Sequence, residues 1–217
     1  MIDKIHRIQQ AGIEVWTGMI VGFDHDEESI FDAQFDFIRD ARVAHALVGM
    51  LAAIPKTPLY DRLLAENRLD LEDPPEFGTN VIPQRMSRAT LREGYVELMR
   101  RLNEPAAYFD RVDSLYHDLT FQFNHAQRAY WQRHPVAWLR DQSKALIRCA
   151  VLFRRLMQQV PEAPLRDEYR RRLASIWKTR HEPAALFVYL IKCAMHYHYS
   201  EMTRALTRQE QTLINSF

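Results

Sequence analysis

The residues best suited to metal or redox chemistry are two cysteines and two histidines in the second half of the chain. Cys149 and Cys193 are too few for a cysteine-only zinc site or an iron–sulfur cluster. Cys193 and His196 would share one helix face, but no further ligand accompanies them. His196 and His198, two residues apart, would point to different faces. We therefore expect no metal site. We expect His198 to be a core histidine with a hydrogen-bond partner, and contact with a substrate is the alternative.

Charged side chains gather in two short segments. Asp24, Asp26, Glu27 and Glu28 suit the N-terminal end of a helix, where negative charge is stabilised. Arg170–Arg172 give a basic helix that could meet phosphates, but Asp167 and Glu168 lie beside them and no nucleic-acid-binding motif is present. We expect a solvated helix face there and no nucleic-acid partner. The sequence also lacks a Ser-His-Asp set, a P-loop and a dinucleotide fingerprint.

Net charge and composition change along the 217 residues, although the whole chain has a formal charge of only +1. Residues 1–86 contain 8 Lys and Arg against 15 Asp and Glu, whereas residues 87–217 contain 21 against 13. Pro74, Pro75 and Pro83 lie in the loop-like stretch between the two parts. We predict an α/β part over residues 1–70, a linker over 71–86 and a helical domain over 87–217. The longest apolar run, Ala184–Ile191, is too short to cross a membrane, and the N-terminus has no signal-peptide core. We therefore expect a cytoplasmic protein.

The acidic part reads as helix, strand, helix, strand, helix. A helix over residues 2–11 is stopped by Gly12, and Glu14–Val21 reads as a strand buried on both faces. A helix from about Asp24 to Ala41 and a strand over Ala44–Ala53 follow, and Thr57 caps a short helix with Pro58 at its first position. This order predicts a parallel βαβ unit. Two parallel strands do not form a stable sheet alone, so their faces and edges must be covered by the rest of the chain, by another chain or by the rest of a barrel.

The basic part reads as helices throughout. They are expected from Ser87, over Ala106–Phe123, from Pro135 to about Val160, over Leu165–Arg180 and from Pro183 onward. Short connections favour an antiparallel bundle. The inward stripe of the last helix is predicted as Phe187, Leu190, Ile191, Ala194, Met195, His198 and Met202.

Two segments at a characteristic distance resemble a known family. Gly18-Met19-Ile20-Val21-Gly22 follows the Gly-x-Ile-x-Gly pattern found on a strand of radical S-adenosylmethionine (SAM) enzymes, and Pro55–Leu63 matches a later segment. The chain resembles the C-terminal part of cobalamin-dependent (B12-binding) radical SAM proteins, in the hopanoid-type branch with an appended helical domain of unknown function. The implied fold class is α/β plus α: the last βα units of a partial radical SAM (β/α) barrel, followed by an all-α helical bundle domain.

The resemblance also implies cofactors that this chain can hold only in part. The family binds a [4Fe–4S] cluster through a Cys-x3-Cys-x2-Cys loop and carries a preceding cobalamin domain, and this sequence contains neither. It implies a partial SAM site in which Gly18, Ile20 and Gly22 lie beside the adenine; close strand–helix packing is the other interpretation of the glycines. His25 stands where the family often has Glu. The chain is not expected to be catalytic alone.

Three functional interpretations remain open at this point. The first is a C-terminal fragment of a radical SAM enzyme, in which the helical domain shapes access for a lipid-like substrate. The second is a non-catalytic helical interaction module, whose acidic and basic parts dock partner subunits or an anionic surface. The third is one chain of a split enzyme whose partner carries the cluster. Because residues 2–12 read as an internal barrel helix, we expect that Met1 is not the natural start and that the missing barrel and cobalamin domain precede it or lie on another chain.

Overall fold

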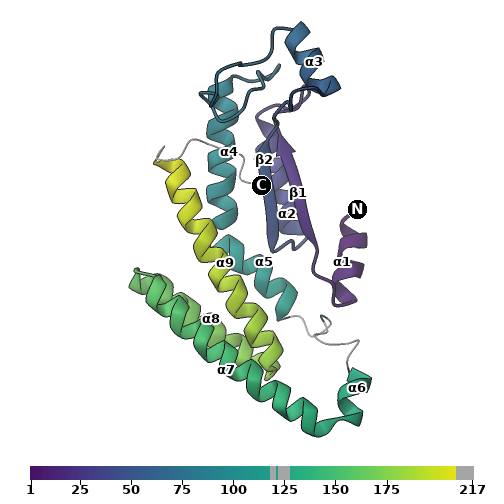
Figure 1. The fold of residues 1–217 in the computed structure, drawn as a ribbon, viewed down its shortest axis with the longest axis vertical. Helices are drawn as coiled ribbons and strands as arrows, with labels where there is room; N and C mark the ends of the chain where they lie inside the picture. Colours follow the sequence, from purple (N-terminus) through teal and green to yellow (C-terminus); the bar gives the residue numbers. More distant parts are fainter. Residues whose placement is uncertain (118–120, 122–127, 209–217) are drawn as a thin grey trace. The chain divides into compact units, whose positions relative to one another are not determined.

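The computed structural model describes residues 1–117, 121 and 128–208, which form a small parallel sheet and a larger set of helices (Figure 1). The elements in chain order are α1 (Ile2–Gln10), β1 (Trp16–Val21), α2 (Ser29–Asp40), β2 (His45–Met50), α3 (Pro58–Ala65), α4 (Arg88–Asn103), α5 (Pro105–Tyr116), α6 (Arg128–Arg133), α7 (Pro135–Gln159), α8 (Ala163–Arg180) and α9 (Pro183–Thr207). None of the described helices is both long and apolar enough to cross a bilayer. The predicted combination of a parallel α/β part and many helices is confirmed.

The chain forms two compact units, each built from separate stretches of sequence. The first unit contains Met1–Val15 and Phe109–Tyr199, and the second contains Trp16–Tyr108 and Ser200–Phe217. Segment 71–86 lies inside the second unit, so the division of the chain at this segment stays a prediction about its domains. We call these the helical unit and the sheet unit below.

In the sheet unit, β1 and β2 pair in parallel with Trp16 opposite His45 and Val21 opposite Met50. This confirms the predicted βαβ order, with α2 as the crossover helix. The prediction that the first strand is buried on both faces is wrong, because Trp16 is 54% and Ile20 42% exposed. The alternating pattern of burial along β1 shows that only one face of this strand is covered.

Helices α2 and α4 pack closely in the sheet unit at a glycine. A Cβ atom on Gly94 of α4 would lie 2.1 Å from a ring carbon of Phe31 on α2, so only glycine fits this contact. Ser87 caps α4 by accepting a hydrogen bond from the Thr90 amide at 2.9 Å. Thr57 caps α3 in the same way through Tyr60, with Pro58 at the first position, as predicted.

Residues 70–86, expected to be a loop, are packed against the end of β2. The Asn80 side chain makes two hydrogen bonds of 2.8 Å to the backbone of Ala53, one in each direction. The Thr79 hydroxyl donates to the Leu51 carbonyl, and Val81 is fully buried. This segment therefore supplies polar partners for backbone that follows a parallel strand.

In the helical unit, buried charges are paired across helices. The Lys192 ammonium of α9 donates to Glu14 at 2.5 Å, and the Tyr116 hydroxyl of α5 donates to the other oxygen of the same carboxylate at 2.7 Å. The Arg172 guanidinium lies 4.6 Å from the Phe109 ring centre and pairs with Asp113, which also accepts from Tyr189 at 2.5 Å. These contacts join Glu14 to helices α5 and α9, and Asp113 of α5 joins α8 and α9.

The buried face of α9 differs from the predicted stripe. Tyr189, Cys193 and His196 are fully buried, while His198 is exposed, so the expectation of a core histidine at 198 is wrong. His196 is the core histidine instead, with its Nδ1 2.7 Å from the Tyr169 hydroxyl. Periodicity misassigned the face because α9 is apolar on both sides, and the polar partners of Lys192 and His196 decide which side is buried.

The remaining helices follow the sequence closely. Helix α7 begins at Pro135 and ends at Gln159, as the two prolines that bracket it predict. Helix α5 ends at Tyr116, and the last residues of the predicted helix over Ala106–Phe123, including Leu119, lie outside the described residues except Phe121. Phe109, Val112 and Leu115 are buried, as expected.

Candidate functional site

The uncovered face of the sheet is the first candidate site. Trp16, Gly18 and Ile20 alternate along β1 and are all exposed, and Leu47, the register partner of Gly18 on β2, is 41% exposed. Thr17 and Met19, which alternate with them, are partly buried, and Val21 at the end of β1 and Val48 on β2 are buried. The sheet therefore presents a flat apolar surface on one side and a helix-covered surface on the other.

The three residues expected to lie beside SAM fall into two groups. A Cβ on Gly18 would meet nothing within 4 Å, so this glycine leaves open space above the strand beside the exposed Ile20. Gly22 has φ +101°, and a Cβ there would lie 3.0 Å from a methyl group of Leu91. Gly18 and Ile20 thus share the open face, whereas Gly22 serves backbone geometry and packing on α4.

The acidic segment after β1 forms a turn instead of the first turn of a helix. The backbone amides of Gly22 and Phe23 donate to one carboxylate oxygen of Asp26, at 2.8 and 2.9 Å. Helix α2 starts only at Ser29, so the predicted helix start at Asp24 is wrong. Asp26 competes with helix formation because its side chain satisfies backbone donors locally.

Asp24 connects the two segments that carry the family resemblance. Its carboxylate pairs with Arg62 of α3 at 2.5 Å and with Arg68 at 2.8 Å. The hydrogen bond from Arg62, followed by that from Arg68, lowers the pKa of Asp24. His25, which replaces the acidic residue of the family pattern, is exposed beside this pair. No pattern in the sequence indicates this contact, because 38 residues separate Asp24 from Arg62.

The cysteines and histidines form no metal site within the described residues. Burial raises the pKa of the Cys149 and Cys193 thiols, so neither is a ready thiolate ligand. His198 faces a shallow apolar hollow of about 290 Å³ together with Ile191, Met195 and Leu152 of α7. Substrate contact by His198 stays a prediction.

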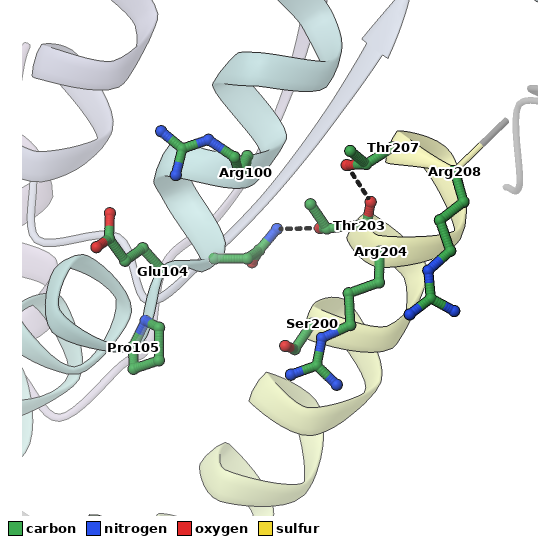
Figure 2. A pocket seen from close by; sticks show the side chains of 9 residues that line it. Arg100, Glu104, Pro105, Ser200, Thr203, Arg204, Thr207 and Arg208 are labelled. Atoms are coloured by element: carbon green, nitrogen blue, oxygen red, sulfur yellow. Dashed lines mark hydrogen bonds between the residues drawn. The ribbon is translucent and has the colours of Figure 1, made fainter. Parts of the chain in front are cut away.

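A second hollow, in the sheet unit, is lined by cations (Figure 2). It has a volume of about 360 Å³ and lies between the end of α4 and the last turns of α9. Arg100 is held by Glu97 through two bonds of 2.7 Å, and Arg204 pairs with Glu201 at 2.6 Å. Arg208 also lines the hollow, but Glu104 adds a negative charge there. Because Arg100 and Arg204 are already neutralised by neighbours on their own helices, the hollow has little net charge for an anion.

The basic segment of α8 is a salt-bridged helix face, as expected. Arg170 pairs with Asp167 at 2.8 Å, and Arg171 and Arg172 share Glu168. Its cations are therefore matched by acids one turn earlier on the same helix.

Comparison with known proteins identifies relatives that match between half and about four fifths of the chain. The family described as "Domain of unknown function (DUF4070)" matches residues 57–212. The hopanoid C-2 methylase of Rhodopseudomonas palustris (strain TIE-1) is 27% identical over 178 residues, which are 82% of this chain and 30% of that protein. These matches confirm the resemblance to the hopanoid-type branch of B12-binding radical SAM proteins.

Two further relatives are methyltransferases by name. The uncharacterized methyltransferase sll1242 of Synechocystis sp. (strain ATCC 27184 / PCC 6803 / Kazusa) is 32% identical over 115 residues, 51% of this chain and 21% of that protein. The bacteriochlorophyllide d C-12(1)-methyltransferase of Chlorobaculum tepidum (strain ATCC 49652 / DSM 12025 / NBRC 103806 / TLS) is 27% identical over 113 residues, 52% of this chain and 24% of that protein. The chain thus spans less than a third of the length of each relative. No solved structure matches it.

Proposed function

The chain belongs to the family described as Domain of unknown function (DUF4070), and we propose that it acts as the C-terminal part of a cobalamin-dependent radical SAM methyltransferase. In this role, β1 and β2 are late strands of a partial (β/α) barrel, and the helices after residue 87 form the appended domain. Relatives that are named as a methylase or as methyltransferases, and that are more than twice as long as this chain, support this assignment.

The open apolar face of β1 is the observation that carries the proposal. In a (β/α) barrel, one face of each strand contacts helices and the other lines the interior. β1 has this division: Val21 is buried, while Gly18 and Ile20 face open space. An aromatic ring system such as adenine fits a flat surface in which a glycine allows close approach and an isoleucine supplies apolar contact.

The residues of this chain fit SAM in part and do not fit the iron–sulfur cluster. Gly18 and Ile20 would hold the adenine, and Gly22 would shape the turn that follows the strand. When bound, SAM supplies the methyl and adenosyl groups that the proposed methyltransferase reaction uses. Cluster ligands and cobalamin contacts would come from the remainder of the barrel, on the same polypeptide or on a partner chain. A lipid-like substrate and a cytoplasmic location complete the proposal.

Nuclear magnetic resonance on the isotope-labelled chain tests this site directly. SAM added to the 217-residue chain should shift the amide signals of Trp16–Phe23 and Leu47. Gly18→Val should abolish these shifts, because a branched side chain fills the space above the strand. Thr17→Val, on the neighbouring residue of β1, is the matched control and should keep them. Unchanged β1 signals in the presence of SAM, or equal behaviour of the two variants, would overturn the assignment.

A second experiment separates an incomplete enzyme from a complete one. Under anaerobic, reducing conditions, the chain alone should release no 5′-deoxyadenosine from SAM, because its sequence contains no Cys-x3-Cys-x2-Cys loop. Copurification with a cysteine-rich chain that restores this release would favour the split enzyme. Release by the purified chain alone would contradict the proposed dependence on missing parts.

A further inference from the structure

The outward face of α7 is the most unusual surface of the helical unit. This 25-residue helix carries five basic residues and one acidic residue, and all five basic residues are exposed: Arg140, Lys144, Arg148, Arg154 and Arg155. Within the part of the chain that the structure describes, none of their side chains takes part in an ion pair or hydrogen bond. This differs from α8, where neighbouring acids neutralise the cations.

Large apolar side chains share this outward face. Val136 is 81% and Ile147 64% exposed, and Leu139, Leu146 and Val151 are also exposed. The opposite side of α7 is buried at Cys149 and Leu156, which shows that the helix already has a packed inner face. The exposed apolar residues are therefore additional to those that hold α7 in the helical unit.

The two kinds of residue are interleaved along the outward side of the helix. Arg140, Lys144 and Arg148 follow one another at a spacing of four residues, so they lie on one side of the cylinder. Val136, Leu139 and Leu146 repeat at spacings of three and seven, and Ile147 and Val151 add a further pair four apart. Ile147 and Val151 therefore lie among the cations, and Leu139 and Leu146 lie beside them, over a helix about 37 Å long.

We propose that the outward face of α7 binds the surface of a membrane that contains anionic lipids. A helix lying in the interface places apolar side chains among the acyl chains, while lysine and arginine contact the headgroup phosphates. The long side chains of arginine and lysine can reach upward to the phosphates from a helix lying at this depth. This role is independent of the SAM site, and it goes beyond the proposed function.

A protein partner fits the same surface less well. Charged residues as a class are depleted in the cores of protein–protein interfaces, and burial of five unmatched cations against a protein would require five new partners. An anionic bilayer supplies phosphates at any position along the helix, so it needs no specific matching. We therefore choose the lipid surface as the occupant, and a protein partner or a second copy of this chain is an alternative outcome of the test.

Vesicle cosedimentation with the full 217-residue chain tests the proposal. The chain should sediment with vesicles of phosphatidylcholine mixed with phosphatidylglycerol, and much less with vesicles of phosphatidylcholine alone. The variant R140E/K144E/R148E should bind the anionic vesicles at least about a hundredfold more weakly, because it removes three cations that attract the lipid phosphates and adds three carboxylates that repel them.

The matched control carries the same change of charge on the other basic helix. R170E/R171E/K178E alters three exposed cations of α8 and should retain most of the binding. I147S/V151S keeps the charge of α7 constant and should weaken binding by a smaller factor, because it removes only apolar contact. Far-ultraviolet circular dichroism and thermal unfolding of each variant show that the fold is retained.

Three results would overturn the proposal. One is equal binding to neutral and anionic vesicles, and another is equal loss of binding in the α7 and α8 charge variants. The third is absence of vesicle binding, in which case light scattering that shows a dimer lost in I147S/V151S would assign the face to a second copy of the chain.

Discussion

Two exposed apolar surfaces of this protein differ in their charge. None of the four exposed residues of the open sheet face, Trp16, Gly18, Ile20 and Leu47, has an ionisable side chain. The outward face of α7 combines exposed apolar residues with five cations that have no partner among the described residues. Both surfaces leave apolar area in contact with water, but only the second can attract an anion.

This difference indicates what each surface can bind. An uncharged, flat face with a glycine opening suits more protein or an aromatic ring system, because shape and apolar contact are all that it offers. A face with rows of cations and apolar groups suits a surface that is negative outside and apolar inside, such as a bilayer. Stability measurements can show how tightly each unit is packed beneath its exposed surface, and the salt dependence of binding can show whether the two surfaces differ in charge.

The largest effect is expected for the buried cation of the helical unit. Lys192→Ala removes the buried ammonium that pairs with the partly buried Glu14 carboxylate and should lower the free energy of unfolding by about 3–5 kcal/mol. Lys144→Ala on the outward face of α7 should change it by less than about 0.5 kcal/mol. Urea denaturation measures both values. A similar decrease in the free energy of unfolding in both variants would show that Lys144 takes part in stabilising contacts and is not a free cation on the surface of α7.

The next effect separates the covered and open sides of the sheet unit. Gly94→Ala forces a methyl group into the Phe31 ring and should destabilise the chain by about 1–3 kcal/mol. Gly18→Ala adds a methyl group to open space and should change stability by less than about 0.5 kcal/mol. A Gly18→Ala loss as large as that of Gly94→Ala would mean that the sheet face is covered in solution.

Salt should distinguish the two surfaces by their charge. Raising the ionic strength from low to physiological values should weaken binding of the chain to anionic vesicles by about tenfold, because counterions screen the α7 cations. The shifts that neutral adenosine induces in β1 should change by less than about twofold, since neither partner is charged. Titrations at two salt concentrations measure both, and equal salt dependence would remove the distinction.

The smallest effect concerns the ion pair beside the sheet. Because Arg62 and Arg68 lower the pKa of Asp24, the folded state binds fewer protons than the unfolded state near the ordinary value of 3.8. The contribution of the Asp24 ion pair to the free energy of unfolding is therefore fully present above the ordinary pKa of 3.8. It is lost as the pH falls through the lower pKa that Asp24 has in the folded state. Asp24→Asn should reduce this acid-induced loss by less than about 1 kcal/mol, as expected for a partly exposed pair. The measurement is the free energy of unfolding as a function of pH for the original chain and for Asp24→Asn. The same pH dependence in both proteins would contradict the prediction.

Much of the local structure followed from the sequence alone. Thr57 with Pro58, Ser87 and Pro135 marked helix starts because capping and the fixed φ of proline act within one turn. The parallel βαβ order followed from the alternation of elements, and the family followed from Gly18–Gly22 and Pro55–Leu63. These signals are local, so one stretch of residues is enough to read them.

Only the tertiary structure decided which faces are buried and which are open. Gly18 and Gly22 look alike in sequence, but a Cβ atom on Gly18 would have no neighbour within 4 Å, whereas a Cβ atom on Gly22 would lie against Leu91. His196, rather than His198, lies in the core because Tyr169 supplies its partner 27 residues away. Burial of a polar group depends on where its partner lies in space, and this distance is set by the packing of whole helices and not by spacing along the chain.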